Sequence, residues 1–383
     1  MAYNKIGFHT SPGGYEQGLG DWMRALDAAG IPFCIKGADY AGPVWEGQQL
    51  AKESGVQHVL VYRRSGQGWD VPNYDLSPFD AAAIHWQQHR DAFPPELDKD
   101  WVWLETINEV DKGRADWLGW FAFETAQLVL RDGYRWAAFG WSSGEPEPEH
   151  WETPGMLAYL DLAAVYPGRL AVALHEYSFT TADIMHGYPY KIGRFQFLFD
   201  ACDQNFIPRP TVLITEWGWE YNHVPEPTRA MGDIAAVAAI YADHPQILGA
   251  NLWHLGGGYD GIALEAQKLI EPMTFFTLNT IFDDNPEPPD PPEPPLDPGL
   301  PRIQYEREYW VVSSEVPVGT RRQIYLLAAE AQKTCGPSYD DSGIGALEDK
   351  TAVLWELLES ERETYRAWYE EHYPTTIVQF RNL

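Results

Sequence analysis

The sequence predicts an α/β protein: a (β/α)8 TIM barrel followed by a small C-terminal α/β domain. The first observation is that eight short apolar runs alternate with amphipathic segments of helical periodicity over about the first 284 residues. The second is size, because one such barrel needs about 250 residues and the chain has 383. The third is a proline-rich segment, 285–301, which separates the barrel region from a tail of its own α/β pattern.

The barrel prediction depends on eight candidate strands with helical segments between them. An open, doubly wound sheet is the alternative, and it usually carries a glycine-rich phosphate loop after its first strand. Here Thr-Ser-Pro-Gly-Gly follows His9, which does not match that loop, so the barrel is favoured. The expected strands are 5–9, 32–36, 58–62, 101–105, 134–141, 170–175, 211–215 and 247–253.

The domain boundaries follow from the proline-rich segment. Proline occupies nine of its seventeen positions, with acidic residues between, which is typical of a semi-rigid spacer. We therefore expect a barrel at 1–284, a linker at 285–301 and an accessory domain at 302–383, which docks a polymer or a protein partner. In the accessory domain we expect strands at 308–312, 352–357 and 376–380, and helices at 320–332 and 360–372.

Charge excludes two classes of partner. The formal net charge is −29, so neither nucleic acid nor an anionic membrane surface is expected to bind. We see no signal peptide and no apolar run long enough to span a bilayer. The compartment stays open between the cytoplasm and delivery by another route, such as a phage.

Cysteine and histidine spacing predicts neither a metal nor a cofactor. The three cysteines, Cys34, Cys202 and Cys335, are widely scattered and match no disulfide framework. His85 and His89 stand four apart on a predicted helix, but no third ligand accompanies them.

Aromatic residues make up 14% of the chain, with 17 Trp, 21 Tyr and 16 Phe. Flat apolar rings beside carboxylates suit sugar rings, which favours a carbohydrate ligand. A tryptophan-rich core is the other interpretation.

In a barrel, catalytic side chains come from the carboxyl ends of the strands. Two glutamates follow strands four and seven, where they can face each other across the barrel mouth. The residues at these strand ends are Asn108 and Glu109 at the end of strand four, His175 and Tyr177 at the end of strand six, Glu216 and Trp217 at the end of strand seven, and Trp253 at the end of strand eight.

Together these motifs resemble the clan A glycoside hydrolases, barrels with catalytic glutamates after strands four and seven; the resemblance covers about residues 1–283. It implies that Glu109 is the general acid/base and Glu216 the nucleophile. It further implies that Asn108 binds the sugar 2-hydroxyl and that Tyr177 orients the nucleophile.

The resemblance places further residues at the substrate. It implies that His175 lies near the acid/base or the bound sugar and that Trp253 forms the floor of the cleaved sugar's subsite. His9 and Trp217 are additional candidates for substrate binding.

The implied activity is retaining hydrolysis of β-glycosidic bonds in an oligo- or polysaccharide by double displacement. Such chemistry needs two carboxyl groups about 5–5.5 Å apart, one protonated and one ionised. A catalytically inactive, glycan-binding barrel is the alternative. An esterase on Ser142 is a third interpretation, since Gly140 to Gly144 matches G-x-S-x-G, although Glu-Pro-Glu-Pro follows where a helix should begin.

The sequence departs from the clan at one position. Family 5 of this clan has an arginine near the end of strand two, where this chain has Lys36. Arg63 and Arg64, after strand three, are candidate substitutes. Glu105 and Glu176 lie near the same strand ends, and we expect them to support the site by hydrogen bonding. The sugar, the linkage and the family within the clan stay open.

Overall fold

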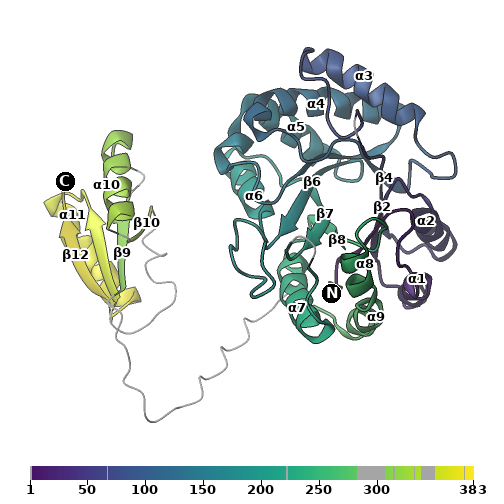
Figure 1. Ribbon diagram of the computed structural model, residues 1–383. Coiled ribbons are helices and arrows are strands. Elements are labelled where there is room, and N and C mark those ends of the chain that lie inside the picture. The colour runs from purple at the N-terminus through teal and green to yellow at the C-terminus, as the bar shows by residue number, and fades with distance from the viewer. Residues whose placement is uncertain are drawn as a thin grey trace, which may run out of the picture. The chain divides into compact units, whose positions relative to one another are not determined.

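Figure 1 shows a computed structural model of the chain. Its described residues form two compact units, one within Met1–Pro289 and the other within Asp290–Leu383. The predicted linker lies outside the described residues, so the division at 1–284, 285–301 and 302–383 stays a prediction. The structure describes residues 2–66, 68–220, 223–282, 307–313, 315–331, 333–337, 350–374 and 376–383.

The first unit is a closed barrel of eight parallel strands that neighbour each other in sequence order. This confirms the predicted (β/α)8 fold, and each strand lies within three residues of its predicted bounds. The strands are β1 (Ile6–Thr10), β2 (Cys34–Ala38), β3 (Val59–Arg63), β4 (Val102–Glu105), β5 (Arg135–Trp141), β6 (Leu170–Tyr177), β7 (Thr211–Gly218) and β8 (Ile247–Leu252).

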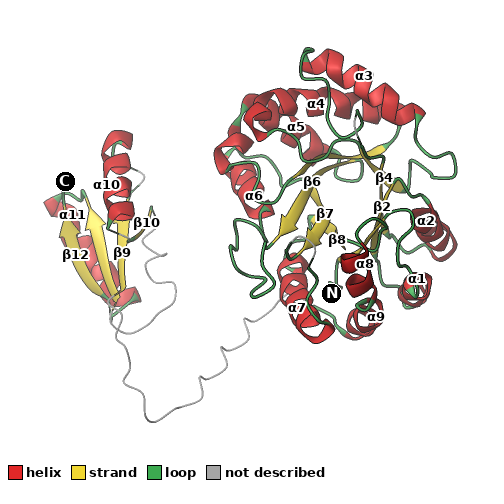
Figure 2. Cartoon of the chain, in the orientation of Figure 1, coloured by secondary structure: helices red, strands yellow, loops and turns green. Residues whose placement is uncertain are grey.

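Helices surround the barrel, as Figure 2 shows in red around the yellow strands. In the first helix, Leu19, Trp22, Met23 and Leu26 are buried at helical spacing and form an apolar stripe. The helices are α1 (Leu19–Ala28), α2 (Gly42–Ser54), α3 (Pro78–Asp91), α4 (Ala115–Asp132), α5 (Pro154–Val165), α6 (Phe195–Gln204), α7 (Pro227–Ala242), α8 (Asp260–Gln267) and α9 (Ile270–Asn279), with 3-10 turns at Lys112–Arg114 and Pro148–Glu152.

Most of the core lies between the strands and these helices, and it absorbs much of the tryptophan. The largest fully buried side chains include seven tryptophans: Trp22, Trp86, Trp136, Trp141, Trp151, Trp217 and Trp219. The core interpretation therefore accounts for much of the aromatic content, and composition by itself is weak evidence for a sugar ligand.

The second unit is a four-stranded parallel sheet of order β10-β9-β11-β12. One face packs Trp310, Val353 and Trp355 against Ile324 of the first helix, and the other packs Leu354 against Tyr369 of the second. This confirms a small α/β domain. The three-residue strand β10 was not among the predicted elements. The elements are β9 (Arg307–Val312), α10 (Val318–Glu330), β10 (Thr334–Gly336), β11 (Lys350–Trp355), α11 (Glu359–His372) and β12 (Ile377–Arg381).

Within the described parts of the chain, no helix is both long enough and apolar enough to cross a bilayer.

The close approach of α4 to α5 yields a stability prediction. A Cβ added at Gly119 would lie 2.1 Å from the backbone nitrogen of Met156 and 2.2 Å from the carbonyl carbon of Gly155. Because backbone atoms cannot rotate away, G119A must push the helices apart, and we expect the free energy of unfolding to fall by about 3 kcal/mol. Urea denaturation measures this change.

Gly232 in α7 is the matched control, because a Cβ there would meet nothing within 4 Å. G232A should raise the free energy of unfolding by up to about 1 kcal/mol, since alanine favours the helix over glycine. If both variants change stability in the same direction, the inferred packing of α4 on α5 is wrong.

Candidate active site

A cavity of about 380 Å³ opens at the carboxyl ends of the barrel strands. Five of the predicted site residues line it: Asn108, Glu109, Tyr177, Glu216 and Trp253. They come from four different strands or the loops that follow them, so the closed barrel brings together residues up to 145 positions apart in the sequence.

Glu216, in β7, is buried and surrounded by positive or donating groups. The hydroxyl of Tyr177 donates a hydrogen bond to its Oε2 at 2.8 Å. Lys36 Nζ and Arg63 Nη1 lie 3.4 and 3.5 Å from its Oε1. Burial by itself raises the pKa of Glu216, but the charges of His175, Lys36 and Arg63 outweigh it and hold the pKa well below the usual range. The Glu216 side chain is therefore a carboxylate.

Lys36, in β2, is the cation on which two buried carboxylates depend. Its side chain is fully buried, and its Nζ lies 2.8 Å from Oε2 of Glu105 as well as 3.4 Å from Glu216. Thr215 donates to the other oxygen of Glu105 at 3.2 Å. Burial raises the pKa of Glu105, but Lys36 and the other positive groups lower it to about 2. Strand two thus supplies a lysine cation where family 5 would supply arginine.

Arg63, the last residue of β3, and Arg64, which follows it, lie in different environments. Arg63 is buried, lies beside Glu216 and donates a hydrogen bond to the side-chain oxygen of Asn108. Arg64 is exposed and stacks on Trp69, 4.5 Å from the ring centre. Arg63 is therefore part of the site and Arg64 is not.

Glu109 differs from Glu216 in its backbone and in its exposure. Its φ of +47° is left-handed, and its backbone N–H donates to the carbonyl of Gly140 at 2.8 Å. Its side chain is 53% exposed, and Ser142 donates to its Oε1 at 3.4 Å. The neighbouring His175 is the main reason that the pKa of Glu109 lies below its usual value.

His175, in β6, joins the two predicted catalytic carboxylates. Its Nδ1 lies 3.5 Å from Oε1 of Glu109 and 3.6 Å from Oε2 of Glu216. These two oxygens are therefore at most about 7 Å apart, the sum of those distances. Burial lowers the pKa of His175, but Glu216, Glu105 and Glu109 more than compensate and raise it. Glu109 thus raises the pKa of His175, while His175 lowers the pKa of Glu109.

The remaining predicted residues fall in three places. His9 lies beneath the cavity with its Nε2 3.9 Å from Glu216, and burial lowers its pKa well below the usual value, so it is neutral. Trp253 stands edge-on to Tyr177 and Tyr259, at 6.3 and 5.0 Å between ring centres. Trp217 is completely buried against Trp219 and does not line the cavity, so its packing does not favour the predicted sugar contact.

Phe179 is a cavity residue that sequence reasoning missed. Its φ is +60°, a conformation that costs a bulky residue of the order of 1–3 kcal/mol, yet its ring is half exposed at the cavity. Lys191 Nζ lies 4.4 Å above the ring. Nothing in the sequence around Phe179 indicates a left-handed backbone, because glycine is the usual signal for one.

Two alternatives are tested by the same geometry. Ser142 donates a hydrogen bond to Glu109, and residues 143–147 contain a turn at 143–144 and a bend at 146 rather than the helix that a nucleophile elbow needs. Glu176, expected to support the site, instead binds the backbone N–H of Gly193 and the hydroxyl of Tyr241 on the outer side of the barrel. Among the residues that the structure describes, no three His, Cys, Asp or Glu side chains are grouped to hold a metal.

No protein-family model matches the chain, and no curated protein matches it by sequence. Among solved structures, it is similar to a Bacteroides ovatus GH5 xyloglucanase in complex with a XXXG heptasaccharide. The identity is 11%, the match covers 70% of this chain and 75% of that one, and the TM-score is 0.36. A TM-score this low does not discriminate between barrel families.

The Lys36–Glu105 pair yields a prediction about stability. K36M leaves Glu105 buried without its cation, and removing one partner of a buried ion pair costs about 3–5 kcal/mol of unfolding free energy. Urea denaturation at pH 7 should show this loss. Folding lowers the pKa of Glu105 from its usual range to about 2, so the stabilisation is present above about pH 4 and is lost as the pH falls toward 2.

The control is the double variant K36M/E105Q. A neutral amide needs no cation, so the double variant should recover more than half of the stability that K36M loses. The two losses would instead be additive if Lys36 and Glu105 did not interact.

Proposed function

We propose that the barrel is a retaining glycoside hydrolase that cleaves β-glycosidic bonds of an oligo- or polysaccharide. The observation that carries the proposal is the contact of one imidazole nitrogen with both Glu109, which follows β4, and Glu216, which lies in β7. The oxygens of the two carboxylates are at most about 7 Å apart. This limit admits the spacing of retaining enzymes, about 5–5.5 Å, and excludes most of the inverting range, about 6.5–9.5 Å.

In the first step, a carboxylate oxygen of Glu216 attacks the anomeric carbon and forms an ester bond to the sugar. The glycosidic C–O bond breaks, and the departing oxygen takes a proton from Glu109. Tyr177, Lys36 and Arg63 favour the ionised form of Glu216, which is the form able to attack. In the second step, Glu109 removes a proton from water, the water oxygen bonds to the anomeric carbon, and Glu216 is released as carboxylate.

The proton that Glu109 donates is supplied by His175 in this proposal. In the free site Glu109 is ionised and His175 carries the proton, because each shifts the pKa of the other in that direction. A sugar over the half-exposed Glu109 excludes water, which raises the pKa of a carboxyl and lowers that of an imidazole. Both changes move the proton across the 3.5 Å gap to Glu109.

Sugar binding is assigned to the aromatic wall and to Asn108. Trp253, Tyr259 and Phe179 present ring faces or edges to the cavity, and such rings suit the apolar faces of a sugar. Arg63 fixes the side-chain oxygen of Asn108, which leaves its amide N–H groups to a sugar hydroxyl. No cofactor is needed for this reaction.

A glycan-binding barrel without catalysis is the second candidate. The lowered pKa of Glu109 favours it, since an ionised carboxylate cannot assist a leaving group. Turnover of aryl glycosides separates the two.

The two carboxylates should respond differently to mutation. E216A removes the covalent step and should lose essentially all activity on every substrate. E109A should still react with activated aryl glycosides, whose leaving group needs no proton, but should lose about 10²–10⁴-fold on natural linkages. Azide should accelerate E109A, because it replaces the water that now lacks a base. Initial rates on both substrate classes measure these effects.

E152A is the control, because Glu152 is an exposed carboxylate outside the cavity, and its rates should match the wild type. Identical responses of E109A and E216A to the leaving group and to azide would contradict the assigned roles. Wild-type protein that binds glycans but never turns over would establish the second candidate.

The pH profile should report His175. The lowered pKa of Glu216 and the raised pKa of His175 predict that kcat/KM falls only below the usual carboxyl range and above about pH 6.5. H175N removes a positive group beside Glu216, so the pKa of Glu216 and the acid limb of the pH profile should move to higher pH. The alkaline limb should move to lower pH, because it would then report the pKa of Glu109 alone. H186N, at an exposed histidine, is the control. An H175N profile as wide as the wild type would refute the shared proton.

A further inference from the structure

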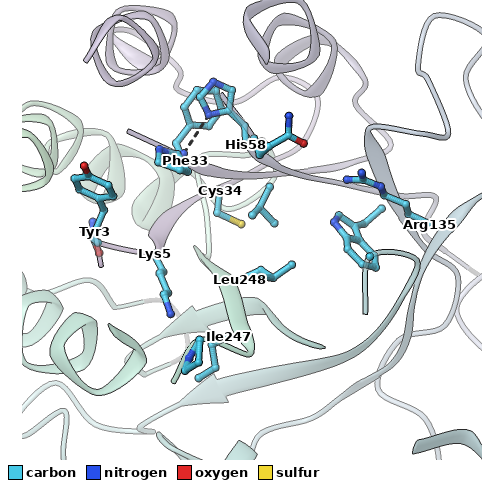
Figure 3. Close-up of a pocket in the computed structure, with 15 residues that line it drawn as sticks. Tyr3, Lys5, Phe33, Cys34, His58, Arg135, Ile247 and Leu248 are labelled. Carbon is cyan, nitrogen blue, oxygen red and sulfur yellow. Dashed lines mark hydrogen bonds between the residues drawn. The ribbon is translucent and has the colours of Figure 1, made fainter. Parts of the chain in front are cut away.

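A second cavity, also of about 380 Å³, lies at the opposite end of the barrel (Figure 3). It is lined by residues at or before the starts of the strands, among them Cys34 of β2, Val59 of β3, Trp103 of β4, Arg135 of β5 and Leu248 of β8. Because all eight strands are parallel, this is the N-terminal face, and none of the proposed catalytic residues lines it.

The inner apolar cluster of the barrel borders this cavity, because Cys34, Val59 and Trp103 belong to both. Three of the eight residues in the inner apolar cluster are alanines, Ala137, Ala171 and Ala173, whereas such barrels usually carry bulky branched residues there. Leu248, at the start of β8, is 37% exposed. The result is an open hollow with mainly apolar walls.

The charge of this hollow is opposite to that of the chain. The net charge is −29, yet no acidic residue of the described chain lines the cavity, while Lys5 and Arg135 do. Lys5 is already engaged, because its Nζ donates to the carbonyls of Tyr241 and His244 at 2.8 and 2.9 Å. The lining of the cavity therefore favours an anion, although Asp98 and Asp100 lie near enough to act on Arg135.

Arg135 is the cation that offers free donors. Its Nε–H is buried and has no acceptor among the described residues. Its guanidinium lies 5.7 Å from the ring centre of Trp103. Burial and Arg169 lower its pKa more than Asp100 and Asp98 raise it. In Figure 3 the side chain extends into the cavity from the side away from Lys5. A half-buried guanidinium with unused N–H groups fits an anion that can accept two parallel hydrogen bonds.

We propose that this cavity is a binding site for a small apolar carboxylate, with Arg135 holding the carboxylate and Val59, Trp103 and Leu248 contacting its apolar body. One guanidinium suits a single negative charge; a phosphate monoester would need more donors than these walls provide. The volume is at the lower end for ligand cavities, about 300–1,000 Å³, so the body is one fused ring system or a short chain. The site is independent of the function proposed for the other end.

Isothermal titration calorimetry of the full chain tests this site. The probes are 2-naphthoate for a flat body and octanoate for a chain, with 2-naphthol as the uncharged match. We expect at least one carboxylate to bind at millimolar concentration or below, and 2-naphthol to bind at least about tenfold more weakly. R135M, which keeps the apolar stem, should weaken the carboxylate about tenfold or more.

R169M is the matched control. Arg169 also carries a positive charge and influences Arg135, but it pairs with Asp100 at 2.7 Å and does not line the cavity. R169M should change affinity less than about threefold. L248W fills the hollow from an exposed position and should abolish binding even if R135M folds poorly.

Three outcomes would overturn the proposal. The first is that neither carboxylate binds the wild type at millimolar concentration. The second is an equal loss of carboxylate affinity in R135M and R169M, which would indicate a general electrostatic attraction rather than a binding site at Arg135. The third is undiminished binding to L248W, which would place the probe elsewhere on the molecule.

Discussion

The barrel mouth is organised by buried charge that must be balanced. Glu105 and Glu216 are both buried, and an isolated carboxylate in such a place would take up a proton or unfold the strand that carries it. Lys36 contacts both of them, and Arg63 adds a second cation beside Glu216. These contacts cross from β2 and β3 to β4 and β7, so charge balance fixes how opposite walls of the barrel approach each other. The position of Glu216 follows from that balance.

The same network makes the two proposed catalytic carboxylates unequal. Glu216 is enclosed and receives a hydrogen bond from Tyr177 together with the field of three cations, which keeps it ionised. Glu109 stands after the end of β4 on a left-handed residue, with half of its side chain exposed and His175 as its main partner. One carboxylate is therefore insulated from changes in solvent, and the other is sensitive to them. Double displacement needs this difference, because one group must stay anionic while the other exchanges a proton twice.

Strand order was the part of this arrangement that the sequence made predictable. The hydrophobic periodicity and the length of the apolar runs identified the eight strands. The parallel barrel then placed Glu109 and Glu216 at one face, because the carboxyl ends of parallel strands meet there. Packing was not predictable: Trp217 sits beside Glu216 in the sequence but faces the core, since β7 is irregular where it pairs with β8. Phe179 and Lys36 were also beyond pattern reasoning. Their roles depend on a left-handed backbone and on a contact between residues 180 positions apart, Lys36 and Glu216.

Both ends of the barrel depend on the same strand register. Lys36 and Cys34 are two residues apart on β2, and Glu105 and Trp103 are two apart on β4, so each pair faces the same way. Cys34 pairs with Val59 and Val61 pairs with Trp103, while Arg63 pairs with Glu105. Inward positions near the N-terminal face thus carry thiol, aliphatic and indole groups, and those two residues further on carry lysine, arginine and glutamate. A shift of one residue in any of these strands would turn its charged side chain away from the barrel interior and toward the apolar layer between strands and helices. Its apolar inward side chains would turn outward as well. The apolar layer below therefore also shields the charged network from water at the N-terminal face, which strengthens each ion pair within it.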